Sequence, residues 1–112
     1  MLDVREYLDP EGRNPYKRWF DRLNAQAAAK VATAVTRLAL GNVSNVKGVG
    51  SQMLELRIDF GPGYRVYFGR AGERLIILLG GGTKKRQQGD INDAISRWAD
   101  YRRRKREQRK WH

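Results

Sequence analysis

The chain has 112 residues, and its 23 lysines and arginines against 12 acidic residues give a formal net charge of +11. This length predicts one domain over residues 1–112, and the lack of cysteine excludes a disulfide framework and a thiolate metal site. The charge predicts a polyanionic partner, which is nucleic acid, an acidic protein or an anionic membrane surface. The first residues lack a signal-peptide pattern and the longest apolar run covers only residues 75–79, so we expect a cytoplasmic protein without a membrane span.

The N-terminal half predicts a short strand followed by two helices. Apolar residues in the segment 2–8 indicate the strand, which ends at the turn-forming residues 9–12. Asn14 and Pro15 then form an N-cap and a first helical position, and the apolar residues from 16 to 23 repeat at helical spacing. The alanine-rich segment 25–40 predicts a second helix, so the two helices make a helical hairpin.

Strand periodicity replaces helical periodicity after a predicted loop through residues 49–51. The segments 54–60 and 64–68 alternate apolar and polar residues around the turn Gly61-Pro62-Gly63. The run 75–79 is apolar throughout, which predicts a central strand covered on both faces and ended by the glycines 80–82. These three strands are expected to form an antiparallel meander.

The last predicted helix starts at Asp90 and has an apolar stripe that reaches Tyr101. A basic extension begins at about residue 102, and residues 102–110 contain seven lysines and arginines and one glutamate. This extension could lengthen the helix, bind RNA or an acidic partner, or fray in solution. The order of elements predicts an α+β fold whose helices pack on one face of the sheet and leave the opposite, polar face open to a ligand.

Polar side chains of that open face are the first candidate functional residues. Because strand side chains alternate, Glu55, Arg57 and Asp59 share one face, and Arg65 and Tyr67 share it on the next strand. Guanidinium groups fork onto phosphate oxygens, Tyr67 offers a stacking surface or a hydroxyl, and Glu55 can take a proton. The alternative is a solvated face on which Glu55 pairs with one of the arginines.

A second basic cluster, Lys84-Lys85-Arg86, follows the glycines 80–82. Three cations at the end of a strand can hold a phosphate or stabilise a leaving oxygen, and the alternative is a solvated turn. The glycines lack the spacing of a P-loop or a dinucleotide fingerprint, so no nucleotide cofactor is expected. No metal site is expected either, because the chain has no cluster of histidines and cysteines.

The histidine and the aromatic residues of the helices are not expected to take part in catalysis or ligand binding. His112, the one histidine, lies at the chain end, where a general base would be badly positioned. The aromatic residues of the helices are predicted to lie in the core, namely Trp19, Phe20 and Trp98.

The stretches MLELRIDFGPGYRVYF and LLGGGTKKRQQGDINDAISRW resemble the RelE/ParE superfamily of type II toxins. Within it, they resemble most the addiction module killer proteins related to HigB, and the resemblance covers nearly the whole chain. It implies a RelE-like fold and a metal-independent ribonuclease that cuts messenger RNA on the ribosome without a cofactor. It also implies a cognate antitoxin, and we expect an acidic antitoxin segment to cover the basic face.

The same resemblance implies roles for individual residues. Arg57 would orient the ribose 2′-hydroxyl or contact the phosphate, Arg65 would hold the scissile phosphate, and Lys85 would stabilise the phosphorane or the leaving oxygen. The base would be Glu55 or a lysine of lowered pKa, since an arginine stays protonated. The further expected RNA contacts are Lys84, Arg86, Tyr67, Tyr64, Arg102 and Arg103.

The sequence departs from this family at two points. Ile91 stands where RelE has a tyrosine, and no histidine precedes position 112. ParE-like members share the fold and poison DNA gyrase, so a gyrase poison is one alternative, and a non-catalytic RNA-binding protein is another. The joint presence of Arg57, Arg65 and the lysines 84 and 85 favours the ribonuclease.

Overall fold

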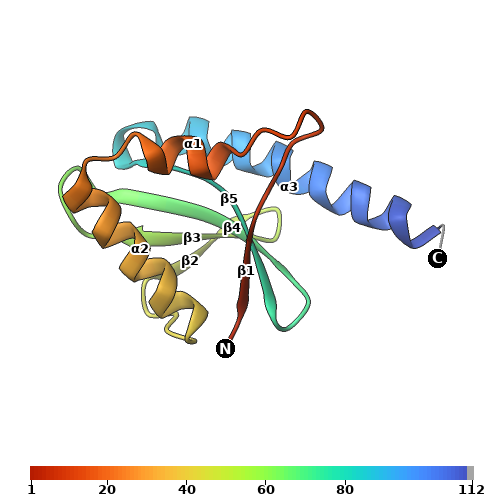
Figure 1. The fold of residues 1–112 in the computed structure, drawn as a ribbon, viewed down its shortest axis with the longest axis horizontal. Helices are drawn as coiled ribbons and strands as arrows, with labels where there is room; N and C mark the ends of the chain where they lie inside the picture. Colours follow the sequence, from red (N-terminus) through yellow and green to blue (C-terminus); the bar gives the residue numbers. More distant parts are fainter. Residues whose placement is uncertain (111–112) are drawn as a thin grey trace.

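A sheet of five strands in the order β1-β5-β4-β3-β2 forms the centre of the molecule (Figure 1). The computed structural model describes residues 1–110. Strands β2, β3, β4 and β5 pair antiparallel with one another in this order, and β1 pairs in parallel with β5. The strand bounds are β1 Asp3–Glu6, β2 Val46–Gly50, β3 Met53–Ile58, β4 Tyr64–Ala71 and β5 Leu75–Thr83. The mixed α+β class is therefore confirmed.

Strand β2 is a correction to the sequence-based prediction, which placed no strand between the second helix and residue 54. Its two valines, Val46 and Val49, lie three residues apart and pack into different core clusters, so they do not produce an alternating pattern. A bulge between Gly48 and Gly50 further disturbs the register with β3. The strand therefore depends on pairing with β3 rather than on a local signal.

Three helices accompany the sheet: α1 (Pro15–Asp21), α2 (Ala25–Ala39) and α3 (Gln87–Lys110), the last preceded by a 3₁₀ turn, η1 (Lys84–Arg86). The predicted helical hairpin is confirmed, and both of its helices begin at asparagine caps. The Asn14 side chain accepts a hydrogen bond from the Lys17 amide at 2.9 Å, and Asn24 accepts one from the Ala27 amide at 2.8 Å. Within residues 1–110, no helix combines the length and apolar character needed to cross a membrane.

Helix α3 starts at Gln87, three residues before the predicted Asp90, and it includes the basic extension as far as Lys110. Of the choices left open for this extension, the structure shows a continued helix. The residues at 111 and 112, including His112, lie outside the described part of the chain.

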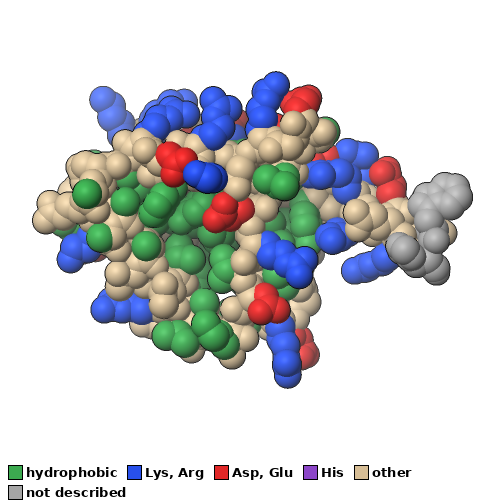
Figure 2. Space-filling model, viewed as in Figure 1, with side chains coloured by type: hydrophobic (Ala, Val, Ile, Leu, Met, Phe, Trp, Pro, Cys, Tyr) green, Lys and Arg blue, Asp and Glu red, His purple; other side chains and the backbone are tan. Residues whose placement is uncertain are grey.

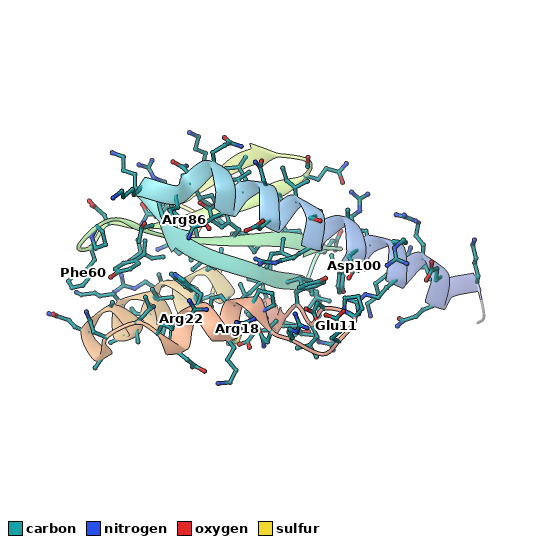
Figure 3. All side chains as sticks on the ribbon, turned by 90° about the horizontal axis from the view of Figure 1, so that it is seen from above. Glu11, Arg18, Arg22, Phe60, Arg86 and Asp100 are labelled. Atoms are coloured by element: carbon teal, nitrogen blue, oxygen red, sulfur yellow. The ribbon has the colours of Figure 1, made fainter. Side chains whose placement is uncertain are left out.

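The helices cover both faces of the sheet, and the prediction that they share one face was wrong (Figure 3). Helices α1 and α2 pack on the face that carries Leu56, Val66 and Phe68. Helix α3 packs on the opposite face through Ala94 and Trp98. The physical reason is that this second face is itself largely apolar, because Met53, Tyr67, Ile77 and Leu79 point to it.

The predicted central strand, β5, is indeed buried on both faces, but it does not end at its glycines. It continues through residues 80–82 to Thr83. A Cβ atom at Gly81 would lie less than 3.0 Å from the Trp19 ring, and one at Gly82 less than 3.0 Å from the Asp90 carboxylate. These glycines therefore let α1 and α3 approach the strand closely.

Candidate nucleic-acid interface

A buried ion pair joins β3 and β4 on the face that α3 covers. The strand register places Glu55 opposite Tyr67 and Arg57 opposite Arg65. The Arg65 Nε atom lies 3.1 Å from Glu55 Oε1, and the two side chains are only 6% and 1% exposed. The Gln87 amide of α3 donates a hydrogen bond to Glu55 Oε2 at 2.8 Å. Both carboxylate oxygens of Glu55 are thus engaged by the protein.

This arrangement corrects the expectation of an open polar face. Glu55, Arg65 and Tyr67 are buried, and Arg57 alone of the predicted strand cations is exposed. The geometry favours the alternative in which Glu55 pairs with an arginine. Tyr67 has no exposed surface on which a base could stack. The pKa of its hydroxyl is raised, mainly by burial and to a smaller extent by the negative charges of Glu55 and Asp90.

A cleft of about 380 Å³ opens beside the ion pair, and it is called the sheet cleft below. Its cations come from four segments of the chain, and its one carboxylate is the exposed Asp59, which directly follows β3. The four cations are Lys47, Arg57, Arg65 and Lys84. The structure thus brings together three of the residues that the sequence singled out and adds Lys47 to them.

The turn between β3 and β4 brings Lys84 next to Arg65. The Lys84 amide donates a hydrogen bond to the Gly63 carbonyl at 2.9 Å. Gly63 has a φ of +80°, and a Cβ atom there would lie 3.6 Å from Lys84 Cβ and 3.8 Å from Arg65 Nη1. The backbone of Gly63 therefore sits between the two cations, and the outer nitrogen of the otherwise buried Arg65 reaches the cleft wall.

The other predicted RNA contacts near η1 lie outside the sheet cleft. Lys85 is exposed on η1 but does not line the sheet cleft. Arg86 lines a different cavity, between α1 and α3. Tyr64 points to the opposite sheet face, where its ring centroid lies 6.3 Å from that of Trp19.

The predicted RNA contacts on the distal part of α3 make contacts within that helix, and their role toward RNA stays a prediction. The Arg102 guanidinium lies 6.0 Å from the centroid of the Trp98 ring. Arg103 forms ion pairs with Asp100 at 2.6 Å and with Glu107 at 3.3 Å. Neither arginine lines the sheet cleft.

Sequence reasoning missed Lys47 and Gln87. Lys47 lies opposite Glu55 on β2, and that strand carried no alternating signal. Gln87 reaches Glu55 only because α3 begins earlier than predicted and folds over the sheet. Within the described residues, no three histidine, cysteine or acidic side chains are grouped so that they could hold a metal ion.

Comparison with known proteins places these elements in a family. Residues 18–102 match the model of the phage-derived Gp49-like proteins (DUF891). The chain belongs to the Gp49-like family. This is a phage-derived family of the RelE/HigB type that is associated with the toxins of toxin–antitoxin systems, and the association implies an antitoxin partner.

A relative also aligns with most of the chain. An uncharacterised protein of Haemophilus influenzae is 42% identical to this Gp49-like protein over 80 residues, which make up 70% of this chain and 81% of the relative. The family model, rather than this relative, confirms the predicted toxin–antitoxin relationship at the level of the family, and the branch related to HigB stays a prediction.

Proposed function

We propose that this Gp49-like protein is the toxin of a toxin–antitoxin pair and an endoribonuclease that cuts messenger RNA on the ribosome without a metal. The observation that carries the proposal is the sheet cleft, in which four cations face a space of about 380 Å³. Guanidinium and ammonium groups gathered in this way suit a phosphodiester whose negative charge increases in the transition state.

In the proposed reaction, the ribose 2′-oxygen attacks the adjacent phosphorus and the bond from phosphorus to the 5′-oxygen breaks. The products are a 2′,3′-cyclic phosphate and a free 5′-hydroxyl, whose oxygen takes its proton from water as it leaves. Arg57, Arg65 and Lys84 would stabilise the charge of the phosphorane because they line the same cleft. Lys85 does not line it, so in this proposal Lys84 takes the role expected of its neighbour.

Glu55 acts in this proposal through Arg65. A general base needs to reach the hydroxyl that it deprotonates, whereas Glu55 is 1% exposed and both of its oxygens are engaged. Its carboxylate instead holds the Arg65 guanidinium in one orientation before the substrate arrives. Asp59 is the exposed carboxylate in the cleft, and in this proposal it is the general base that takes the proton from the 2′-hydroxyl.

The test is primer extension on cellular messenger RNA after brief induction of the protein alone. We expect discrete cuts within translated codons, and we expect Arg57→Ala to reduce them by about 10²–10³-fold, the effect of losing one donor to a transition-state oxyanion. Arg57 is exposed, so its loss should leave the fold intact. A message without its start codon should stay uncut if the reaction depends on translation.

Arg37→Ala is the matched control, because it removes an equally exposed arginine from α2, away from the sheet cleft. If Arg57→Ala cut messenger RNA as well as the unchanged protein does, the sheet cleft would not be the cleavage site. Growth arrest with intact messages would contradict the nuclease and would indicate a gyrase poison instead.

A further inference from the structure

A second basic cavity lies between α1 and the first turns of α3, and it is called the arginine cleft below. It encloses about 590 Å³ and is lined by five arginines and three aspartates. Arg18 of α1 and Arg22, the C-cap residue of that helix, lie on the opposite side of the end of β5 from Arg86 of η1 (Figure 3). The proposed cleavage reaction makes no use of this cavity.

The floor of the arginine cleft is formed by the end of β5, against which the Trp19 ring and the Asp90 carboxylate pack. Gly81 and Gly82 line it, and a Cβ atom at either position would collide with Trp19 or Asp90. Strand β1 pairs with β5 only from Leu75 to Leu78, so it does not cover this end of the strand. A ligand between the two helices can therefore contact the Trp19 ring and the Asp90 carboxylate, which line the cleft at this end of β5.

The arginines on α1 have no acidic partner in the chain as described. Arg18 and Arg22 are exposed, one helical turn apart, and neither forms an ion pair with any of residues 1–110. The neighbouring pair, Lys17 and Asp21, is joined at 2.6 Å on the same helix. Like charges at this spacing destabilise a helix, and a bound anion would offset that repulsion.

The aspartates indicate which anion fits. Asp90 is half-buried, and burial raises its pKa although Arg86 and Arg97 oppose this shift. Asp93 lines the same cleft and is exposed. Carboxylates accept hydrogen bonds from the amino groups of nucleobases, whereas they repel an acidic peptide. Arginines and aspartates together therefore match a nucleotide better than they match a run of glutamates.

Each of the two clefts is lined by a residue of η1. Lys84 lines the sheet cleft, and Arg86, two residues later, lines the arginine cleft. Two residues of a 3₁₀ turn span about 4 Å, which is less than the length of one extended nucleotide unit. A single strand that crosses η1 can therefore reach Lys84 in the sheet cleft and Arg86 in the arginine cleft with neighbouring nucleotides.

We propose that the arginine cleft binds the backbone and a base of single-stranded RNA next to the segment held in the sheet cleft. The inference rests on the proposed function for the place of the cut, but binding in the arginine cleft needs no catalysis. It adds Arg18, Arg22 and Arg86 as phosphate contacts and Asp90 as a contact to a base amino group.

The test measures fluorescence anisotropy of a labelled 2′-O-methyl RNA strand, which lacks the attacking hydroxyl and stays uncut. We expect Arg18→Ala/Arg22→Ala to weaken binding about tenfold or more and to reduce the slope of log K against log salt by about 1.4, since each phosphate contact on a single strand contributes about 0.7. The control, Arg37→Ala/Arg74→Ala, removes the same charge from exposed positions outside both clefts and should change neither quantity. Thermal unfolding checks that every variant is folded.

An equal loss in the control pair would overturn the proposal, because it would reduce the effect to net charge. Unchanged RNA binding in the Arg18/Arg22 variant would overturn it as well, and a simultaneous loss of binding to a polyglutamate probe would assign the cleft to an acidic protein. A third result would contradict the proposed function alone. In that case primer extension would find no cuts, while Arg18→Ala/Arg22→Ala would still weaken RNA binding.

Discussion

Glu55 and Arg65 show why a charge can lie inside this sheet. Each would be costly to bury alone, because a low-dielectric interior penalises an unpaired ion. Their 3.1 Å contact and the hydrogen bond from Gln87 compensate the carboxylate, while the Arg65 Nε atom has no hydrogen-bond partner. The pair therefore holds Arg65 by charge, at the edge of the sheet cleft.

Breaking this pair should destabilise the fold more than losing an exposed arginine. We expect Glu55→Gln to lower the free energy of unfolding by about 3–5 kcal/mol, because it leaves Arg65 as an uncompensated buried charge. Denaturation in guanidinium chloride measures the change, and Arg57→Ala provides the exposed comparison. The double variant Glu55→Leu/Arg65→Met should recover most of the stability, since an apolar pair replaces both charges, but it should not cut RNA. A loss for Glu55→Gln no larger than for Arg57→Ala would contradict this account of the pair.

At the scale of elements, the sequence predicted the features that depend on contacts between residues close together in the chain. The caps Asn14 and Asn24 lie next to the helices that they start, so the helical hairpin could be read from the sequence. Alternation also placed Arg57 and Arg65 on one face, and the strand register confirms this. Contacts between distant segments decide three other features: which face α3 covers, how β2 pairs and why Glu55 is buried. No local sequence pattern could predict these features.

The glycines of β5 are the point where packing of elements can be tested. We expect Gly81→Ala to destabilise the protein by about 1–3 kcal/mol, because the added methyl group would overlap the Trp19 ring and force α1 away from the sheet. Gly48→Ala is the matched control, as a Cβ atom at that strand glycine would meet nothing within 4 Å. Denaturant midpoints measure how much more Gly81→Ala destabilises the protein than Gly48→Ala does. In a Trp19→Leu background this difference should be smaller, because the smaller side chain leaves room for the added methyl group. Equal midpoints would show that the glycine is not needed for this contact.

At the scale of the whole molecule, the charge is spread well beyond the two clefts. Lysines and arginines follow the rim above α1 and the free end of α3 (Figure 2). The molecule extends 46 Å along its longest axis, in the direction in which α3 projects (Figure 1). Charges at the end of α3 lie outside both clefts, so they act on a polyanion before contact, through the summed field of the protein.

The end of α3 should therefore govern how fast RNA is captured rather than how long it stays. We expect Arg106→Gln/Arg109→Gln to lower the association rate constant for the 2′-O-methyl strand at low salt, and to leave its dissociation rate nearly unchanged, because both side chains are exposed and lie outside the two clefts. Raising the salt concentration above about 0.15 M should remove most of the difference, since charges separated by more than about 8 Å are then screened. Stopped-flow fluorescence measures both rates, and Arg57→Ala should show the opposite pattern, with faster dissociation from the sheet cleft. Faster dissociation in the double variant would instead mean that the end of α3 holds RNA directly, as the sequence predicted for Arg102 and Arg103.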